Sequence, residues 1–130
     1  MRRTWLWLPV ILWAAMILSA SNDSFSATQS AGWLERIFGH AMPHALNVAV
    51  RKCGHLLVYG ILGALAWRAE RRVAIAMVVV AMVAIADEYS QGLTRTRSGS
   101  PWDVLLDLTG AAIAVWVVRR FVVRHDGVPG

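Results

Sequence analysis

Long runs without a charged residue alternate with short polar or basic stretches along this sequence. Residues 4–20, 53–67, 73–86 and 108–118 contain no Asp, Glu, Lys or Arg, although one histidine interrupts the second run. A helix that crosses the ~30 Å hydrocarbon core of a bilayer needs about 20 mostly apolar residues. The pattern predicts four such helices, over about residues 4–20, 52–67, 73–91 and 101–121, of which the second and fourth are short or polar at one end.

The predicted fold class is therefore all-α: a polytopic membrane protein with one four-transmembrane-helix bundle, and residues 1–130 form a single domain. The longest connection, residues 21–52, begins as a polar linker. Apolar residues then recur at helical spacing up to Gly39, namely Trp33, Leu34, Ile37 and Phe38. This spacing predicts a short interfacial helix in the first outer loop. Pro43 favours the start of a further helix that runs into the second span.

The first window has an alternative interpretation, because a basic start, an apolar run and a Ser-rich segment also resemble a secretory signal. Plausible cleavage sites follow Ala20 and Ala27, but neither has a small residue three positions before the cut. This favours an uncleaved first helix. Pro9 would loosen its first turns, which membrane helices tolerate when neighbouring groups satisfy the freed carbonyl.

The composition agrees with a membrane protein and excludes several other classes. Hydrophobic residues make up 57% of the chain and charged residues 16%, against about 45–50% and ~25% in soluble domains. The mean hydropathy is +0.50. Disorder and a disulfide scaffold are excluded, the latter because Cys53 is the one cysteine. The net charge of +5 comes from arginines between the apolar runs, which set membrane orientation rather than bind nucleic acid.

The distribution of basic residues predicts that both termini lie in the cytoplasm. With the N-terminus inside, eight arginines are cytoplasmic: Arg2, Arg3, Arg68, Arg71, Arg72, Arg119, Arg120 and Arg124. Five basic residues are then external: Arg36, Arg51, Lys52, Arg95 and Arg97. Tryptophans fit the same orientation, because Trp67 and Trp116 would lie at the inner interface and Trp33 and Trp102 at the outer one.

Polar side chains gather at the outer ends of three predicted helices. They are Lys52, His55 and Tyr59 on the second helix, Asp87, Glu88 and Gln91 on the third, and Asp103 and Asp107 on the fourth. Those on the second helix are spaced three and four residues apart, so they share one face, and the two on the fourth are four apart. The sequence therefore predicts that three helices bring polar faces to the outer side.

Two of these acids have different explanations. Asp103 follows Ser100 and Pro101, and this arrangement is typical of a helix N-terminus with a cap and an acid in its first turn. Asp107 lies about 6 Å deeper along the helix. A carboxylate at the bilayer centre costs about 2.5–3.5 kcal/mol and less near the interface, which indicates that Asp107 has a function or a partner.

Other charges are placed against the dipoles of their own helices. A helix disfavours acids at its C-terminal end and cations at its N-terminal end, yet Asp87 and Glu88 occupy the former and Lys52 the latter. We expect them to satisfy one another across helices or to bind a ligand. Small residues would permit the close approach this needs: Gly54, Gly60, Gly63 and Ala64 on the second helix and Gly110, Ala111 and Ala114 on the fourth.

Two ordered motifs resemble the VanZ-like family of membrane proteins, named for a protein linked to teicoplanin resistance. RKCGHLLVYGILG, residues 51–63, is similar to the family's Arg-Lys, His, Tyr and Leu-Gly spacing. DEYSQGLTRTRSGSPWDVLLDLTG, residues 87–110, is similar to its Asp-Glu, Gln, Arg, Ser, Asp and Gly string. With four predicted spans, the resemblance covers nearly the whole chain.

The resemblance implies a set of matching site residues: Lys52, His55, Tyr59, Asp87, Glu88, Gln91, Arg97, Ser100, Asp103 and Gly110. The chain departs from the family pattern at Leu93, where an aromatic is usual, at Arg95-Thr96, where Pro-Gly is usual, and at Asp107, where an asparagine is usual. The last change adds a negative charge to the expected site. Because the family has no settled activity, the resemblance implies an architecture and a site rather than a reaction.

The first functional hypothesis is a binding protein of the bacterial cytoplasmic membrane, multi-pass, whose outer face recognises an anionic lipid headgroup or a lipid-linked envelope precursor. Lys52, Arg95 and Arg97 would hold phosphate, and Arg97 suits a bidentate contact. The candidate ligand-binding residues are Lys52, His55, Tyr59, Asp87, Glu88, Gln91, Arg97, Ser100, Asp103 and Asp107. The resemblance also implies a role in the cell envelope and in glycopeptide susceptibility, a form of antibiotic resistance. The oligomeric state is left open.

The alternative hypothesis is an intramembrane hydrolase or transferase for a lipid-linked phosphate substrate. The candidate catalytic residues are His55, Glu88, Asp87 and Tyr59, with Lys52 and Arg97 available to stabilise developing negative charge. A divalent cation, Mg²⁺ or Ca²⁺, is the cofactor that this hypothesis would add, held by Asp87, Glu88, Asp103 and Asp107. No nucleophile is identified, so enzymatic activity is left open. A transporter is disfavoured, because four spans give little room for alternating access.

Overall fold

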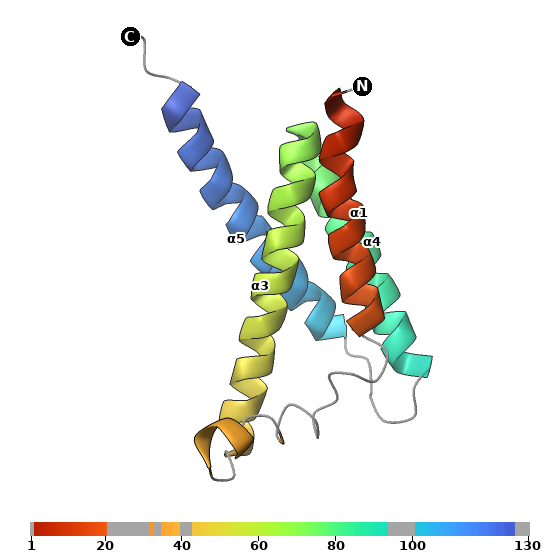
Figure 1. Cartoon of the computed structure of the whole chain (residues 1–130), viewed down its shortest axis with the longest axis vertical. Coiled ribbons are helices and arrows are strands. Elements are labelled where there is room, and N and C mark those ends of the chain that lie inside the picture. Colours follow the sequence, from red (N-terminus) through yellow and green to blue (C-terminus); the bar gives the residue numbers. More distant parts are fainter. Residues whose placement is uncertain (1, 21–31, 33–34, 40–42, 94–100, 127–130) are drawn as a thin grey trace.

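The computed structural model describes residues 2–20, 32, 35–39, 43–93 and 101–126, and the helices among them are long and continuous. They are α1 (Arg2–Ala20), α3 (His44–Glu70), α4 (Val73–Leu93) and α5 (Pro101–Asp126), shown in Figure 1. No strand occurs among the described residues. The all-α class is therefore confirmed. α3 starts directly after Pro43 and runs into the second span, as expected, while α3 and α5 each end a few residues beyond the expected ranges.

A proline precedes α3 and a residue in the left-handed conformation ends it. Pro43 precedes α3 with φ −54° and ψ 140°, so its fixed φ directs the chain into the first helical turn. α3 ends where Arg71 adopts a left-handed φ of 58° and its N–H donates to the Trp67 carbonyl at 2.6 Å. Only Arg71 and Arg72 separate α3 from α4, and this makes the two helices an antiparallel hairpin.

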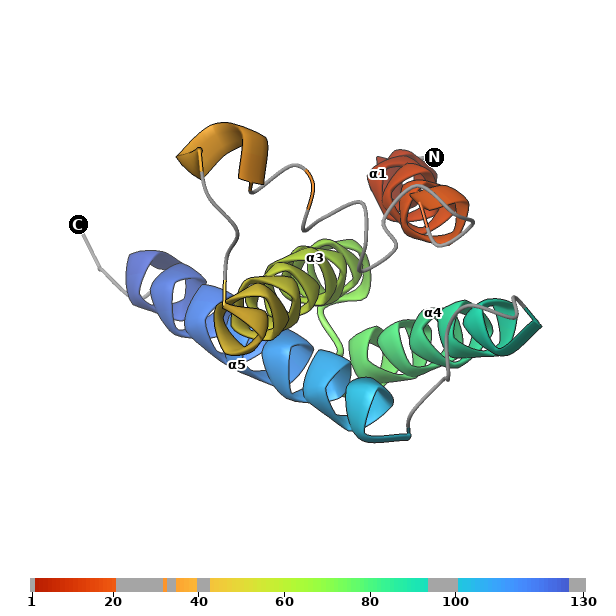
Figure 2. The same ribbon diagram turned by 90° about the horizontal axis from the view of Figure 1, so that it is seen from below.

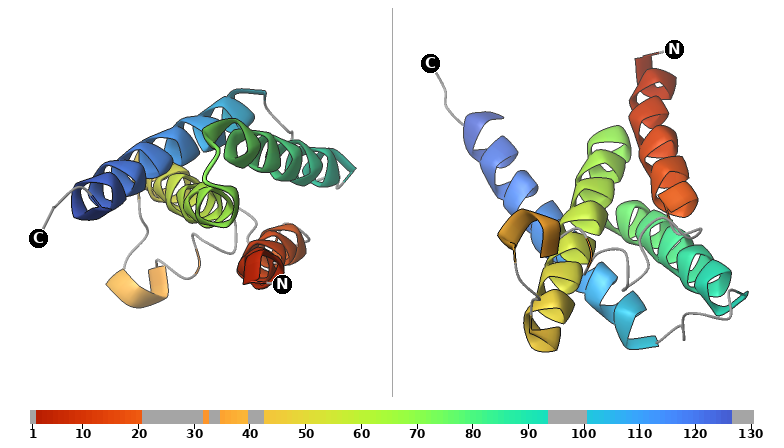
Figure 3. Two further views of the ribbon diagram at one scale, coloured as in Figure 1. Left: turned by 90° about the horizontal axis from the view of Figure 1, so that it is seen from above. Right: turned by 60° about the horizontal axis from the view of Figure 1, so that its bottom comes forward.

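α3 is the central helix of the bundle, because it contacts α1, α4 and α5. α1 and α5 each also contact α4. Seen along the bundle, α1 and α5 flank the α3–α4 pair on opposite sides (Figure 2). α5 crosses α3 at an angle, so the C-terminal half of α5 diverges from the other helices (Figure 3).

The helix ends divide the molecule into two chemically different ends. α1 starts, α3 ends, α4 starts and α5 ends at the same end of the bundle (Figure 1). We call it the arginine end, after its described residues Arg3, Arg68, Arg71, Arg72, Arg119 and Arg120. The opposite end, called the polar end, carries the outer parts of α3, α4 and α5 with Lys52, His55, Asp87, Glu88, Asp103 and Asp107.

Small residues allow α3 and α5 to touch at their crossing. A Cβ added to Gly63 would lie 3.0 Å from the Cβ of Ala111, and one added to Gly60 would lie 3.3 Å from that of Ala114. A Cβ on Gly110 would lie 2.9 Å from the Leu56 carbonyl oxygen. The expected close packing is thus confirmed at these positions. Gly54 was expected to contribute as well, and this is wrong, because nothing lies within 4 Å of a Cβ there.

Many large apolar side chains face outward, and several alanines face the interior. Leu57, Met82 and Trp5 are 68%, 67% and 73% exposed, whereas Ala66 and Ala84 are buried. A soluble protein would not cover its surface with such a continuous apolar layer, but a lipid-facing surface requires one. The packing therefore agrees with a membrane environment around all four helices.

Three helices are long and apolar enough to cross a membrane, in the segments Val48–Glu70, Val73–Ser90 and Pro101–Val122. The expected fourth span is shorter, because the apolar part of α1 covers only Arg3–Ser19. At 1.5 Å per residue this segment is about 25 Å long, less than the ~30 Å of hydrocarbon. By length and composition the described residues therefore contain three spans rather than four.

Two smaller expectations have different outcomes. Residues 35–38 are helical and Gly39 ends the turn with φ 72°, its N–H bonded to the Glu35 carbonyl at 2.8 Å. Trp33 and Leu34 lie outside the described residues, so the full extent of the interfacial helix stays a prediction. Trp67 lies three residues before the end of α3, at the arginine end, and its side chain is 5% exposed. Its expected place at the inner interface stays a prediction.

Candidate functional site

The candidate site lies at the polar end, slightly inside the span. Asp87 and Asp107 are 4% and 2% exposed. Each lies six residues from the polar end of its helix, at Leu93 and Pro101 respectively, which corresponds to about 9 Å. Carboxylates buried at this depth need polar partners, and both find one on α3.

His55 on α3 pairs with Asp107 on α5. The His55 Nδ1 lies 3.2 Å from the Asp107 Oδ1, so a protonated Nδ1 donates a hydrogen bond to the buried carboxylate. The side chain of His55 is 32% exposed and that of Asp107 is 3% exposed. The acid therefore lies behind the imidazole and fixes the ring, and this leaves the second ring nitrogen, Nε2, for other contacts.

Tyr59 on α3 pairs with Asp87 on α4. The Tyr59 hydroxyl donates to the Asp87 Oδ2 at 2.9 Å, and this hydrogen bond is buried. The other oxygen, Asp87 Oδ1, is also buried and accepts no hydrogen bond from the described residues. Tyr59 is only 1% exposed. This second pair is therefore an internal connection between α3 and α4 rather than a surface for ligands.

The two pairs form one continuous cluster through α3. The rings of His55 and Tyr59 lie four residues apart on the same face and stack with their centroids 6.1 Å apart and their planes 15° apart. A line of polar groups therefore runs from Asp107 on α5, through His55 and Tyr59 on α3, to Asp87 on α4. We call these four residues the three-helix cluster. The expectation that three helices converge on one polar site holds for them.

Other predicted site residues lie around this cluster or outside the described part. Lys52 is exposed three residues before His55, and Asp103 lies half-buried in the first turn of α5. Glu88 is half-buried beside Asp87. The side chain of Gln91, and all of Arg97 and Ser100, lie outside the described residues. The expected pairing of Glu88 with Arg97 therefore stays a prediction.

The four acids proposed as metal ligands do not form a metal centre among the described residues. No group of three or more His, Cys, Asp or Glu side chains comes close enough there to hold an ion. Asp87 and Asp107 instead accept hydrogen bonds from Tyr59 and His55. The divalent cation of the alternative hypothesis thus gains no support from the geometry.

The cluster has the chemistry of an oriented imidazole. A buried carboxylate behind a histidine fixes the ring tautomer and stabilises a positive charge on it. Such a histidine can donate to an anion through Nε2, or accept a proton there when it is neutral. Cys53 is exposed and lies two residues before His55 on the same helix. The arrangement suits binding of an anion or proton transfer.

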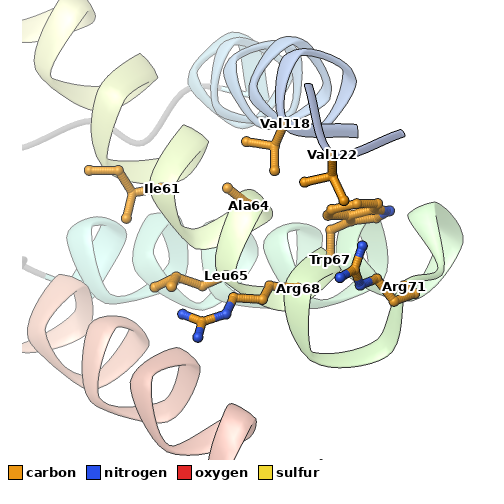
Figure 4. A pocket seen from close by; sticks show the side chains of 8 residues that line it. All are labelled: Ile61, Ala64, Leu65, Trp67, Arg68, Arg71, Val118 and Val122. Carbon is orange, nitrogen blue, oxygen red and sulfur yellow. The ribbon is translucent and has the colours of Figure 1, made fainter. Parts of the chain in front are cut away.

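Sequence reasoning missed two features of the bundle. The indole N–H of Trp13 on α1 donates to the Val58 carbonyl on α3 at 2.9 Å, and that of Trp7 donates to Glu70 Oε1 at 3.0 Å. A hollow of about 330 Å³ also lies between α3 and α5 at the arginine end (Figure 4). Neither the tryptophan hydrogen bonds nor the hollow could be predicted from the spacing of residues, because each depends on which helices lie side by side.

Comparison with known proteins identifies the family of this chain. Searches against curated proteins and against solved structures returned no significant match. A sequence model of the VanZ/LLP1 family matches residues 6–123, a range that includes all four described helices nearly in full and every residue of the three-helix cluster. The resemblance seen in the two motifs is thereby confirmed, and the chain belongs to the VanZ/LLP1 family.

Proposed function

We propose that this protein binds a phosphate-bearing headgroup of a membrane lipid or lipid-linked envelope component at its polar end. The observation that carries the proposal is the His55–Asp107 pair, in which a buried acid supports a half-exposed imidazole. This arrangement stabilises the positively charged ring beside the membrane surface. An imidazolium at that position attracts an anionic headgroup, and the surrounding lipid supplies such groups.

Lys52 adds a second positive group on the same face of α3. It lies three residues before His55, is exposed, and makes no hydrogen bond or ion pair with a described residue. An ammonium group and an imidazole one helical turn apart can contact different oxygens of one phosphate. Asp87 and Tyr59 lie beneath them and hold α3 against α4, so that the two cationic groups keep their relative position.

The proposed orientation places the polar end outside the cell and both termini in the cytoplasm of a bacterium. It rests on the excess of arginines at the arginine end. α1 serves as the fourth span. Trp13 in the middle of α1 and Trp7 near its start each donate a hydrogen bond to α3, and the start of α1 lies at the same end of the bundle as the end of α5. A site facing the envelope would fit a role in glycopeptide susceptibility.

The direct test is native mass spectrometry of the purified protein with a lipid monophosphate and a neutral lipid carrying identical chains. We expect the wild type to retain the phosphate-bearing lipid in preference. His55→Gln and Lys52→Gln should each lower its retention by about tenfold, since charge-assisted contacts to phosphate contribute about 1.5–3 kcal/mol. Cys53→Ser changes an exposed residue beside Lys52 and is the matched control. Equal retention in the control and both variants would refute the proposal.

Proton transfer is the second candidate, and the same pair favours it. In the hydrolysis of a lipid diphosphate, His55 Nε2 would take a proton from water while the water oxygen bonds to the terminal phosphorus. The bond between that phosphorus and the bridging oxygen breaks, and the lipid monophosphate that leaves takes the proton back from His55. Incubation with a lipid diphosphate distinguishes the two functions. Release of inorganic phosphate that is lost in His55→Gln and kept in Cys53→Ser supports the enzyme, whereas retention of intact lipid supports binding alone.

A further inference from the structure

The hollow at the arginine end lies far from the three-helix cluster and has its own chemistry. Its walls are apolar side chains from α3 and α5, among them Ala64, Trp67, Val118 and Val122. Arg68 and Arg71, from the C-terminal end of α3, complete the lining (Figure 4). We propose that this hollow binds an anionic phospholipid, with an acyl chain between α3 and α5 and the headgroup phosphate against Arg68 and Arg71.

The shape of the hollow follows from the glycine crossing. α3 and α5 touch at Gly63 and Ala111, where a Cβ would lie 3.0 Å from its neighbour, and they diverge from there to the arginine end (Figure 3). Small side chains such as Ala64 leave this wedge unfilled. Its volume of about 330 Å³ lies at the lower end of the ~300–1,000 Å³ that is usual for ligand pockets.

The position of the hollow along the helices favours a lipid acyl chain as its occupant. Its lining begins at Ile61 on α3, nine residues or about 14 Å before the end of the Val48–Glu70 segment. Val118 and Val122 lie in the last turns of the Pro101–Val122 segment. The hollow is therefore within the hydrocarbon layer and opens at its edge. Apolar cavities exclude water, whereas the surrounding acyl chains can enter.

The positive charge of Arg68 and Arg71 at the rim favours an anionic headgroup. The Arg71 guanidinium stacks over the Trp67 ring at 4.9 Å from its centroid, so Arg71 is held at the mouth rather than free in solution. Arg68 is exposed and makes no hydrogen bond or ion pair with a described residue. Glu70, two residues after Arg68, accepts a hydrogen bond from Trp7 on α1. Two arginines beside an apolar wedge between helices match the chemistry of a phosphate with acyl chains.

The test is native mass spectrometry of the full chain, titrated with phosphatidylglycerol or phosphatidylcholine that have the same acyl chains. We expect the wild type to bind phosphatidylglycerol more tightly. The double variant Arg68→Gln/Arg71→Gln should lose about 25-fold in that preference, about fivefold per arginine. Arg72→Gln/Arg119→Gln removes the same charge from exposed residues outside the hollow, and should stay within about twofold of the wild type.

A second variant tests the acyl-chain part separately. Val118→Phe fills the wedge but keeps both arginines, so it should weaken binding of both lipids while preserving the order of preference. Ala64→Leu makes the same test from the other wall if Val118→Phe lowers the yield of folded protein. The proposal is overturned if the two charge variants lose the preference equally, or if filling the wedge leaves lipid binding unchanged. A dimer that excludes phosphatidylglycerol would also overturn it.

Discussion

At the scale of single residues, the molecule buries two carboxylates between its helices and gives each one donor. Asp87 receives the Tyr59 hydroxyl and Asp107 faces the His55 imidazole. A buried acceptor that loses its donor costs about 1–3 kcal/mol, more when it is charged. The cluster should therefore contribute to stability even where it takes no part in binding.

Tyr59→Phe tests this contribution. The change removes one hydroxyl from a fully buried ring and leaves Asp87 without its described donor, so we expect a loss of about 1–3 kcal/mol. Thermal unfolding in detergent measures it. Tyr89→Phe is the control, because Tyr89 is the other tyrosine, is 71% exposed and lies two residues from Asp87. Similar melting temperatures for both variants would show that the Tyr59 bond carries no net stability.

The sequence predicted which residues form the cluster but not how they pair. Spacings of three and four placed His55 and Tyr59 on one face, and the unfavourable dipole placement of Asp87 indicated a partner on another helix. The partner itself depends on the rotation and tilt of α4 and α5 around α3, and helical periodicity contains no information on either. The same limit explains why the burial of the Trp67 side chain was not predicted.

At the scale of helices, some glycines of α3 form a close helix contact and another does not. Gly54, Gly60 and Gly63 look equivalent as a series on one helix, but only the last two face α5 closely. The helix ranges were predictable because the apolar runs are bounded by charges and prolines. Which small residues form the crossing was not, since that choice follows from the angle between α3 and α5.

Gly110→Ala and Gly54→Ala form a matched pair at this scale. A Cβ on Gly110 would meet the Leu56 carbonyl oxygen at 2.9 Å and its Cα at 3.0 Å. Backbone atoms cannot move aside cheaply, so we expect a loss of about 1–3 kcal/mol. Gly54→Ala enters open space and should leave stability unchanged or raise it by up to about 1 kcal/mol. Unfolding in detergent compares them, and a harmless Gly110→Ala would mean that the helices do not cross this closely.

At the scale of the whole molecule, the two ends of the bundle are expected on opposite sides of the membrane. Cysteine labelling in a Cys53→Ala background tests this in intact cells with a membrane-impermeant reagent. Glu35→Cys and Arg72→Cys are suitable reporters, because both residues are exposed and lie at opposite ends. We expect labelling at residue 35 only. Labelling at residue 72 only would reverse the orientation, and labelling at both would contradict the assignment of sides.

The two-residue connection makes α3 and α4 a helical hairpin, which can enter a bilayer as a unit during synthesis. α4 alone would expose the Asp87 carboxylate to hydrocarbon, but within the hairpin the Tyr59 hydroxyl is already present to meet it. α5 is synthesised last, and Asp107 then finds His55 in place on α3. Asp87 and Asp107 thus each have their donor on a helix that is made earlier.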